Sequence, residues 1–285
     1  MNILITGAKG QLAFEIIDIL NQTDGQITFF APDEAELDIC DINSVSKALK
    51  GMDAVINCAA FTNVDLCETE IEAAYKVNSE GVKNLAIACE NENALLVHIS
   101  TDYVFDGNKK SPYIEDDATN PQTVYGKSKL SGEEEAKKCK KHYILRTSWL
   151  YGTNGKNFVK TMINLGNTKD SVKVVNDQIG TPTYAKDLAY VIINLILNDD
   201  GDYGIYHCTG NGKDVSWFDF TREIFNILDI RTLVLPCSTS EFNAKAKRPT
   251  YSVLENKKLK DKNIDTMRDW KIALKEFLLE RKELL

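Results

Sequence analysis

Tyr125 and Lys129 have the clearest chemical potential in the chain, within the run Val-Tyr-Gly-Lys-Ser-Lys at 124–129. Residues four apart share one face of a helix, so the Lys129 ammonium would approach the Tyr125 phenol. A neighbouring positive charge favours the phenolate and lowers the pKa of a tyrosine. Such a tyrosine can give or take a proton near neutral pH, so we interpret the pair as a general acid–base unit.

A second hydroxyl gives this pair a partner. Thr101 follows an apolar run at 95–100 that predicts a strand, and the carboxyl end of such a strand faces the ligand cleft of a parallel sheet. There Thr101 can hydrogen-bond a substrate carbonyl while Tyr125 protonates the same oxygen. The alternative is that the threonine only bonds backbone at a strand end.

A phosphate-binding loop is predicted by Gly-Ala-Lys-Gly-Gln-Leu-Ala at 7–13, between an apolar run and the first helical periodicity. Gly7 allows a tight turn, and Gly10 lets the backbone approach a pyrophosphate at the positive end of a helix. Ala13 permits close packing of that helix on the strand. In this context the Gly-x-x-Gly-x-x-Ala spacing indicates a dinucleotide site. The alternative is an ordinary strand-to-helix turn.

The ends of the next two strands indicate which cofactor binds and where it would lie. Asp33 follows the second strand, where a carboxylate binds a free ribose 2′-hydroxyl and disfavours a 2′-phosphate. We therefore expect NADH in preference to NADPH, with a turn residue as the alternative role of Asp33. Asp38 and Ile39 are expected to border the adenine. Small residues at 57–62 would let the cofactor lie across the strand ends, unless they serve tight packing alone.

The rest of the chain alternates between two periodicities. Apolar and β-branched runs predict strands at 2–6, 27–30, 54–57, 95–100 and 143–146. Helical periodicity predicts helices at 11–20, 44–49, 73–90 and 121–141. Strands alternating with helices predict an α/β fold with a doubly wound parallel Rossmann sheet. The Glu133/Lys137 and Glu134/Lys138 spacings predict ion pairs on a solvated helix face.

The predicted domain organisation is unequal. Residues 1–150 form the dinucleotide-binding core, to which a strand at 172–175, a helix at 184–197 and a strand at 205–208 are added. Residues 151–285 mainly form a smaller, discontinuous substrate-binding lobe over the carboxyl edge of the sheet. That lobe is expected to contain helices at 218–228 and 267–285.

Composition narrows the classes of partner. A net charge of -8 argues against nucleic acid, and no apolar run is long enough for a membrane span. The amino terminus lacks the basic and apolar regions of a signal peptide. Seven scattered cysteines indicate reduced thiols and a cytoplasmic protein. The three histidines lack ligand spacing, so we predict no metal.

The motifs together resemble the extended short-chain dehydrogenase/reductases, and within them the dTDP-4-dehydrorhamnose reductases. The segments that carry this second resemblance lie at 57–65, 77–81, 100–107, 145–152 and 177–183. It thins after about residue 210, where Lys-Arg-Pro at 247–249 is its clearest match. The asparagine that follows Arg-Pro in the family is displaced here, because the chain continues Thr-Tyr-Ser.

The resemblance implies roles for individual residues. Thr101, Tyr125 and Lys129 would be catalytic, with Lys129 also binding the nicotinamide ribose. The cofactor would contact Tyr125, Lys129 and a set drawn from four strand ends: Gly7, Gly10, Gln11, Leu12, Asp33, Asp38, Ile39, Ala59, Ala60, Phe61, Thr62 and Ile99. The substrate would contact Thr101, Asp102, Val104, Phe105, Trp149 and Arg248. A core aromatic and a surface charge are the alternatives for Trp149 and Arg248.

The implied reaction is NADH- or NADPH-dependent reduction of the C4 ketone of a dTDP-4-keto-6-deoxy-sugar, by a monomer or homodimer. One alternative is another nucleotide-sugar reductase, epimerase or dehydratase of the same fold. Against a dehydratase, Tyr103 and Val104 stand where those enzymes carry acidic residues. The other is a non-catalytic dinucleotide-binding subunit of a methionine adenosyltransferase, against which the intact Thr101, Tyr125 and Lys129 argue.

Overall fold

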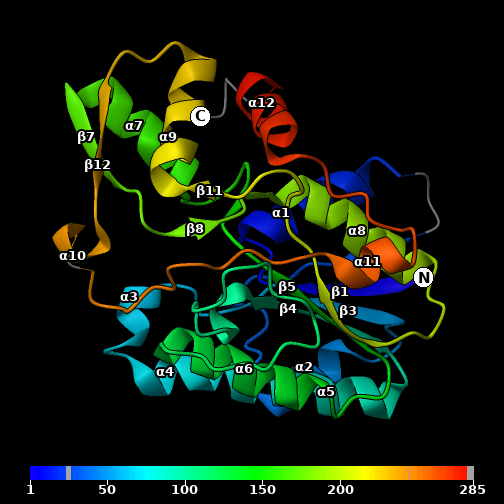
Figure 1. The fold of residues 1–285 in the computed structure, drawn as a ribbon. Helices are drawn as coiled ribbons and strands as arrows, with labels where there is room; N and C mark the ends of the chain where they lie inside the picture. The colour runs from blue at the N-terminus through cyan, green and yellow to red at the C-terminus, as the bar shows by residue number, and fades with distance from the viewer. Residues whose placement is uncertain (24–26, 243, 281–285) are drawn as a thin grey trace.

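A six-stranded parallel sheet forms the centre of the protein (Figure 1). The computed structural model describes residues 1–23, 27–242 and 244–280. The strand order is β10-β5-β4-β3-β1-β2. In chain order the strands are β1 (Asn2–Thr6), β2 (Thr28–Phe30), β3 (Ala54–Asn57), β4 (Leu95–Thr101), β5 (His142–Thr147) and β10 (Gly204–His207). The expected α/β fold with a parallel Rossmann-type sheet is confirmed.

Helices cover both faces of this sheet, as its continuous apolar strands require. On one face α1 (Gln11–Asn21) packs against α8 (Ala185–Leu197), and both enter the larger apolar core. The other face is covered by α2 (Ile42–Ala48), α5 (Gly81–Glu92) and α6 (Val124–Ala136), which lie together below the sheet in Figure 1. The short α11 (Lys257–Asp261) lies along β10.

Two predicted helices differ from the structure in their limits. Helix α6 begins at Val124 rather than 121, because Thr123 caps it by accepting a hydrogen bond from the Gly126 N–H. The helix expected at 73–90 is divided into α4 (Ile71–Tyr75), a π-helical turn η1 (Lys76–Glu80) and α5. The π turn holds Asn78, whose amide bonds the backbone of Phe61 and the hydroxyl of Ser128.

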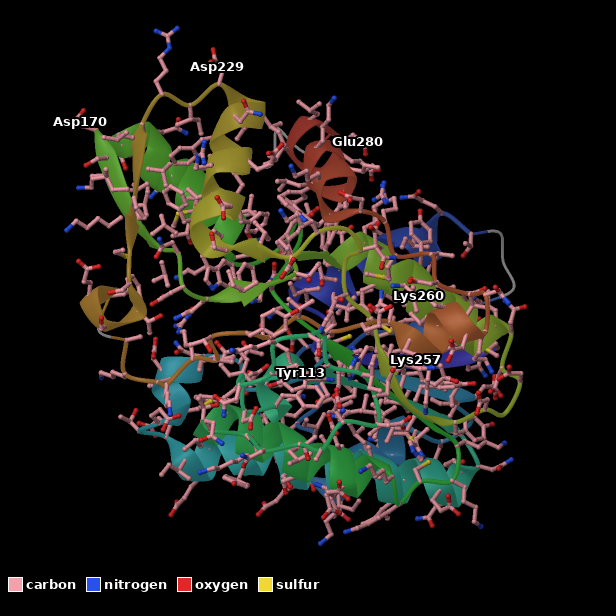
Figure 2. All side chains as sticks on the ribbon, viewed as in Figure 1. Tyr113, Asp170, Asp229, Lys257, Lys260 and Glu280 are labelled. Atoms are coloured by element: carbon pink, nitrogen blue, oxygen red, sulfur yellow. The ribbon has the colours of Figure 1, made fainter. Side chains whose placement is uncertain are left out.

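A smaller second layer is built from the later part of the chain. Its apolar core joins α7 (Phe158–Thr168), β7 (Ser171–Val175), α9 (Trp217–Leu228), β12 (Leu233–Cys237) and α12 (Trp270–Glu280). In Figure 2, Asp170, Asp229 and Glu280 mark the side of this lobe that lies away from the sheet. The helix expected to reach residue 285 is described as far as Glu280, and its last five residues lie outside the described ranges.

One strand assigned to the core was placed wrongly. The strand expected at 172–175 pairs in parallel with β12 instead of joining the central sheet. Its apolar side chains, such as Val172 and Val174, pack against α9 of the smaller lobe. The division of the chain at residue 150 stays a prediction.

Short strands and loops connect the two layers. The pair β6 (Leu150–Tyr151) and β9 (Thr183–Tyr184) is parallel, and β8 (Ile179–Gly180) with β11 (Val215–Ser216) is antiparallel. Near the sheet lie α3 (Val64–Cys67) and the 3-10 turn η2 (Asp102–Val104). The helix α10 (Thr239–Phe242) precedes a segment that returns from the lobe to the sheet, where Tyr251 bridges Ile179 and Leu254 bridges Tyr113.

A buried ion pair fastens α6 to the sheet. Glu133, which is fully buried, accepts hydrogen bonds of 2.9 and 2.7 Å from Arg146 of β5 and one of 2.6 Å from Ser100 of β4. The predicted Glu133/Lys137 surface pair is therefore wrong. Lys137 and Lys138 instead pair with Glu134 and Glu135, three residues earlier.

Replacing one member of this pair leaves a buried charge without its counterion. We expect Glu133→Gln to lower the free energy of unfolding by about 3–5 kcal/mol, measured by urea denaturation. The neighbouring Glu134→Gln, which breaks an exposed pair, serves as the matched control and should cost less than about 0.5 kcal/mol. Equal losses in the two variants would contradict the importance of the buried pair.

Candidate active site

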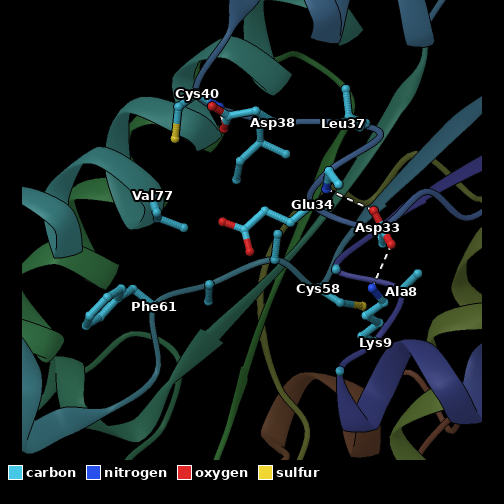
Figure 3. A pocket seen from close by; sticks show the side chains of 16 residues that line it. Ala8, Lys9, Asp33, Glu34, Leu37, Asp38, Cys40, Cys58, Phe61 and Val77 are labelled. Atoms are coloured by element: carbon cyan, nitrogen blue, oxygen red, sulfur yellow. Dashed lines mark hydrogen bonds and ion pairs between the residues drawn. The ribbon is translucent and has the colours of Figure 1, made fainter.

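A cavity of about 670 Å³ opens at the carboxyl ends of β1 and its neighbouring strands (Figure 3). It is lined by the loops that follow the first three strands of the chain. Eight of the expected cofactor residues border it: Gly7, Gly10, Asp33, Asp38, Ile39, Ala59, Ala60 and Phe61. Glu34 and Cys58, which lie within strand ends already expected to meet the cofactor, border it too, as do Lys9, Cys40 and Val77, which the sequence did not single out.

The glycine loop forms a cradle that only glycine permits at its first position. Gly7 has a φ of +69°, and a Cβ there would lie 2.7 Å from the backbone nitrogen of Ala59. The Gly10 N–H donates to the Gly7 carbonyl at 2.8 Å, and Gly10 is the N-cap of α1. The N-terminus of this helix thus meets the cavity with no side chain in front of it. This arrangement fits a pyrophosphate.

An ion pair crosses the rim of the cavity. Lys9 Nζ lies 2.6 Å from Asp33 Oδ2, and Figure 3 shows the two side chains meeting beneath Glu34. The hydrogen bond from Lys9 lowers the pKa of the Asp33 carboxyl. Asp33 also accepts the N–H groups of Ala35 and Glu36, so it is both a turn residue and a pocket residue. The position of Lys9 within the glycine loop was the sequence signal that could have identified it.

Six of the expected cofactor residues lie outside the lining of this cavity, and Tyr125 and Lys129 of the catalytic cluster are two of them. Gln11 accepts a hydrogen bond from Asn157, whereas Leu12 is buried in the core beneath the sheet edge. Thr62 is exposed beyond the cavity. Ile99 offers its backbone carbonyl to Lys129 at 2.6 Å. The structure therefore supports a cofactor contact less directly at these four positions.

The three candidate catalytic side chains converge where β4 meets α6. The Thr101 side chain lies close enough to Tyr125 to influence its pKa, and the Thr101 hydroxyl donates to Asp102 Oδ1 at 2.9 Å. Lys129 lies one helical turn from Tyr125, is almost fully buried, and donates to the Ile99 carbonyl. The rings of Tyr103 and Tyr125 pack edge to face with centroids 5.4 Å apart, a contact that the sequence did not predict.

Burial sets the acid–base character of this cluster. It lowers the pKa of Lys129 to about 8 and raises the pKa of Asp102 to about 6. The expected lowering of the Tyr125 pKa is wrong for this structure, because burial raises it above the ordinary value. Lys129 directs its amine to the Ile99 carbonyl, so its charge does little to offset that burial. A protonated Tyr125 suits a proton donor.

The expected substrate residues lie in different environments. Asp102 is buried beside Thr101, and its Oδ2 has no hydrogen-bond partner. Val104 and Phe105 are fully buried with Tyr113 and Leu254, so their side chains line an apolar cluster rather than an open pocket. Arg248 donates to Asp65 Oδ2 at 3.0 Å, and its Nε is buried without a partner.

Trp149 is held in an unusual backbone conformation. Its φ is +47°, which is rare for a bulky residue. Its indole stacks on Trp217 with ring centroids 3.4 Å apart, and a Cβ at Gly180 would lie 2.4 Å from the same indole. The ring is therefore fixed between the two layers of the protein. It is neither a simple core aromatic nor a freely exposed one.

Comparison with known proteins gives a consistent family. The model of the RmlD substrate binding domain family matches residues 1–283, so the chain belongs to that family. The spore coat polysaccharide biosynthesis protein SpsK of Bacillus subtilis (strain 168) is 42% identical over 98% of this chain and 97% of its own.

Solved structures of two dTDP-4-dehydrorhamnose reductases have the same fold as this protein. The one from Clostridium acetobutylicum is 49% identical with a TM-score of 0.95, over 99% of this chain and 100% of its own. The one from Bacillus anthracis, in complex with NADP, is 41% identical with a TM-score of 0.93, over 98% and 99% of the two chains. A nicotinamide dinucleotide cofactor is supported by that complex and by the cradle at Gly7.

Two features are absent from the part of the chain that the structure describes. Within residues 1–23, 27–242 and 244–280, no helix is long and apolar enough to cross a membrane. In the same ranges no three His, Cys, Asp or Glu side chains gather as a metal site would require.

The glycine cradle can be tested with a pair of glycine-to-alanine variants. Gly7→Ala should abolish dinucleotide binding, because its Cβ would collide with the Ala59 backbone. Gly51→Ala is the matched control, since Gly51 has a similar φ of +72° but nothing within 4 Å of the added Cβ. It should cost about 1–2 kcal/mol of stability and leave binding intact. Titration of NADH or NADPH by calorimetry measures both, and unchanged affinity in Gly7→Ala would contradict the assignment.

Proposed function

We propose that the protein reduces the C4 ketone of a dTDP-4-keto-6-deoxy-sugar, and that its substrate is dTDP-4-dehydrorhamnose and its product dTDP-L-rhamnose. The observation that carries this proposal is the convergence of Thr101, Tyr125 and Lys129 where β4 meets α6. Lys129 of this cluster interacts with Cys58, which lines the cavity at the glycine loop. Membership in a family with dTDP-4-dehydrorhamnose reductases supports the choice of substrate. The product would serve cell-surface polysaccharide synthesis.

The chain supplies binding and proton transfer. When bound, the reduced nicotinamide supplies the hydride for C4 of the sugar. The pyrophosphate of the cofactor would lie on the N-terminus of α1, over Gly7 and Gly10. Asp38 and Ile39 would border its adenine, and Lys129 its nicotinamide ribose.

Proton transfer would occur at the ketone oxygen. The Thr101 hydroxyl hydrogen-bonds that oxygen, while Tyr125 gives it a proton as negative charge develops there. Thr101 acts on the Tyr125 phenol in this structure, so the two hydroxyls lie near one another at the end of β4. The raised pKa of Tyr125 keeps the phenol protonated before the reaction.

The sugar nucleotide would lie between the sheet and the smaller lobe. Asp102 has an unpartnered carboxylate oxygen next to Thr101 that can bond a sugar hydroxyl, and Trp149 presents a fixed indole. Arg248 can bind a diphosphate through two N–H groups. Asp65 holds it in this structure, so a bound diphosphate would share or replace that carboxylate.

The rim of the cofactor cavity bears on the choice between NADH and NADPH. Asp33 and Glu34 place two carboxylates beside the expected ribose, which favours the free 2′-hydroxyl of NADH. Lys9 partly neutralises Asp33, and this leaves a cation that could accept a 2′-phosphate. We propose that NADH is preferred and that NADPH remains usable.

Removal of the proton donor tests the reaction directly. Tyr125→Phe should lower kcat for reduction of dTDP-4-dehydrorhamnose by about 10²–10⁴-fold, with little change in KM for the cofactor. The matched control is Tyr143→Phe, a buried tyrosine whose hydroxyl bonds Asp199 at the other end of β5. Cofactor oxidation followed at 340 nm measures the rates, and product NMR gives the configuration at C4. Near-normal turnover by Tyr125→Phe would reject the mechanism.

Two opposing variants test the cofactor preference. Asp33→Asn should raise the ratio of kcat/KM for NADPH to that for NADH by about tenfold, because Lys9 is then free to bind a phosphate. Lys9→Gln should lower the same ratio, because it removes the cation. The two ratios are measured with one sugar substrate at fixed ionic strength. Changes of the same sign in both variants would show that this pair does not choose the cofactor.

A further inference from the structure

A row of polar side chains crosses the buried face of the sheet towards Lys129. Thr6, Asn57 and His98 stand on β1, β3 and β4, and the strand register places each directly beside the next. All three are at most 2% exposed. Buried polar groups are stable only when they are hydrogen-bonded, so the bonds between them can be traced as one network.

The hydrogen bonds of this row run in one direction, because the Ala59 N–H can only donate and Asn57 Oδ1 can only accept. The Ala59 N–H, which can only donate, points to Thr6 Oγ1 at 3.4 Å. The Thr6 hydroxyl then donates to Asn57 Oδ1 at 2.7 Å, and the Asn57 amide N–H faces His98 Nδ1 at 3.1 Å. Each donor therefore points away from Ala59 and towards α6.

The far end of the row reaches the lysine. His98 Nε2 lies 3.5 Å from Lys129 Nζ, at the long limit of a hydrogen bond. Burial lowers the pKa of His98 well below its usual value, so the ring is neutral and carries one proton. Since Nδ1 accepts from Asn57, that proton is on Nε2 and faces the amine.

An N–H that faces an amine distinguishes its two charge states. An uncharged amine has a lone pair that can accept from His98 Nε2, whereas an ammonium has only donors and is repelled. Lys129 still donates to the Ile99 carbonyl at 2.6 Å in either state. The row of donors therefore acts on the charge of Lys129 and leaves its other contact in place.

Other titratable groups also act on Lys129. Glu133, on the same helix, favours the ammonium, but Arg146 holds both of its oxygens. The Cys58 thiol, after β3, is buried with a raised pKa and stays neutral. Tyr125 lies one turn earlier on α6, and Thr101 and Asp102 act on its phenol. Among the titratable groups of the described residues, His98 is the one within hydrogen-bond distance of the amine itself.

From this geometry we infer that Thr6, Asn57 and His98 are positioning residues that act through Lys129: their aligned hydrogen bonds turn the His98 Nε2–H towards the amine and favour its uncharged form. The inference rests on the proposed function only for the role of Lys129 at the nicotinamide ribose. Its consequence is an alkaline limit on cofactor binding and turnover, since the ammonium that holds the ribose is lost at lower pH than in an ordinary lysine.

Thr6→Val tests the row at its start, far from Lys129. Without the hydroxyl, the Asn57 amide can turn its oxygen to His98, which moves the ring proton to Nδ1 and leaves a lone pair facing the ammonium. The alkaline midpoint of NADH binding, followed by tryptophan fluorescence, should then move up by about 0.5–1 pH unit. His98→Leu should move it in the same direction, because it removes the opposing N–H.

The controls separate this effect from a loss of packing. Thr6→Ser keeps the hydroxyl and should keep the wild-type midpoint, and so should Thr221→Val, an equally buried threonine of α9 outside the row. Lys129→Met should remove the transition. Unmoved or lowered midpoints in Thr6→Val would overturn the inference, as would a transition that persists in Lys129→Met. If His98→Leu does not fold, Thr6→Val and Thr6→Ser decide the question.

The same variants assayed for turnover keep the two proposals apart. The pH profile of kcat for dTDP-4-dehydrorhamnose reduction should show the same upward shift of its alkaline limb in Thr6→Val. A protein that reduces no dTDP-4-keto sugar would reject the proposed function, whereas the NADH titration still tests the row of hydrogen bonds without any turnover.

Discussion

A carboxylate and a guanidinium meet inside this protein where no water reaches them. Glu133 and Arg146 each lie at most 2% exposed, and Ser100 completes the contact from a third element. Two charges taken out of water are stable only in close, well-oriented contact, so this contact tolerates little rotation of α6. The rotation of α6 in turn decides where Lys129 and Tyr125 point. The orientation of the acid–base residues thus depends on an ion pair that takes no part in the chemistry.

The cofactor end of the site depends on a different constraint, close approach of backbone to backbone. Gly7 packs against the Ala59 peptide so tightly that no side chain fits between them. That same Ala59 peptide donates to Thr6 and begins the polar row that ends at Lys129. Phosphate recognition and the charge of the lysine are therefore linked through one peptide group. The π turn supports this region from below, where Asn78 bonds both backbone groups of Phe61.

Much of the fold and the chemical core of the site follow from local sequence pattern. The alternation of apolar runs and helical periodicity predicted the parallel sheet. The spacing of Tyr125 and Lys129, together with the glycine loop and Thr101 upstream, singled out the acid–base pair. Glu133 was misplaced because charge spacing along a helix does not show which face meets the sheet. The partner of β7 could not be predicted, since β12 lies far along the chain and pairing depends on tertiary contacts. For the same reason Asp65 could not be foreseen beside Arg248.

The order of strands in the sheet has a consequence for synthesis of the chain. On the ribosome, β1 to β5 can assemble once residue 147 has emerged, but the outer edge of β5 stays open until β10 follows some sixty residues later. An open edge strand is a template for pairing with another chain. The nascent protein thus passes through a stage in which Arg146, already paired with Glu133, lies on an edge strand with no neighbour. Pairing of β10 with β5 closes that edge, and α11 then packs on β10, so the growing chain loses its open template for pairing with another chain.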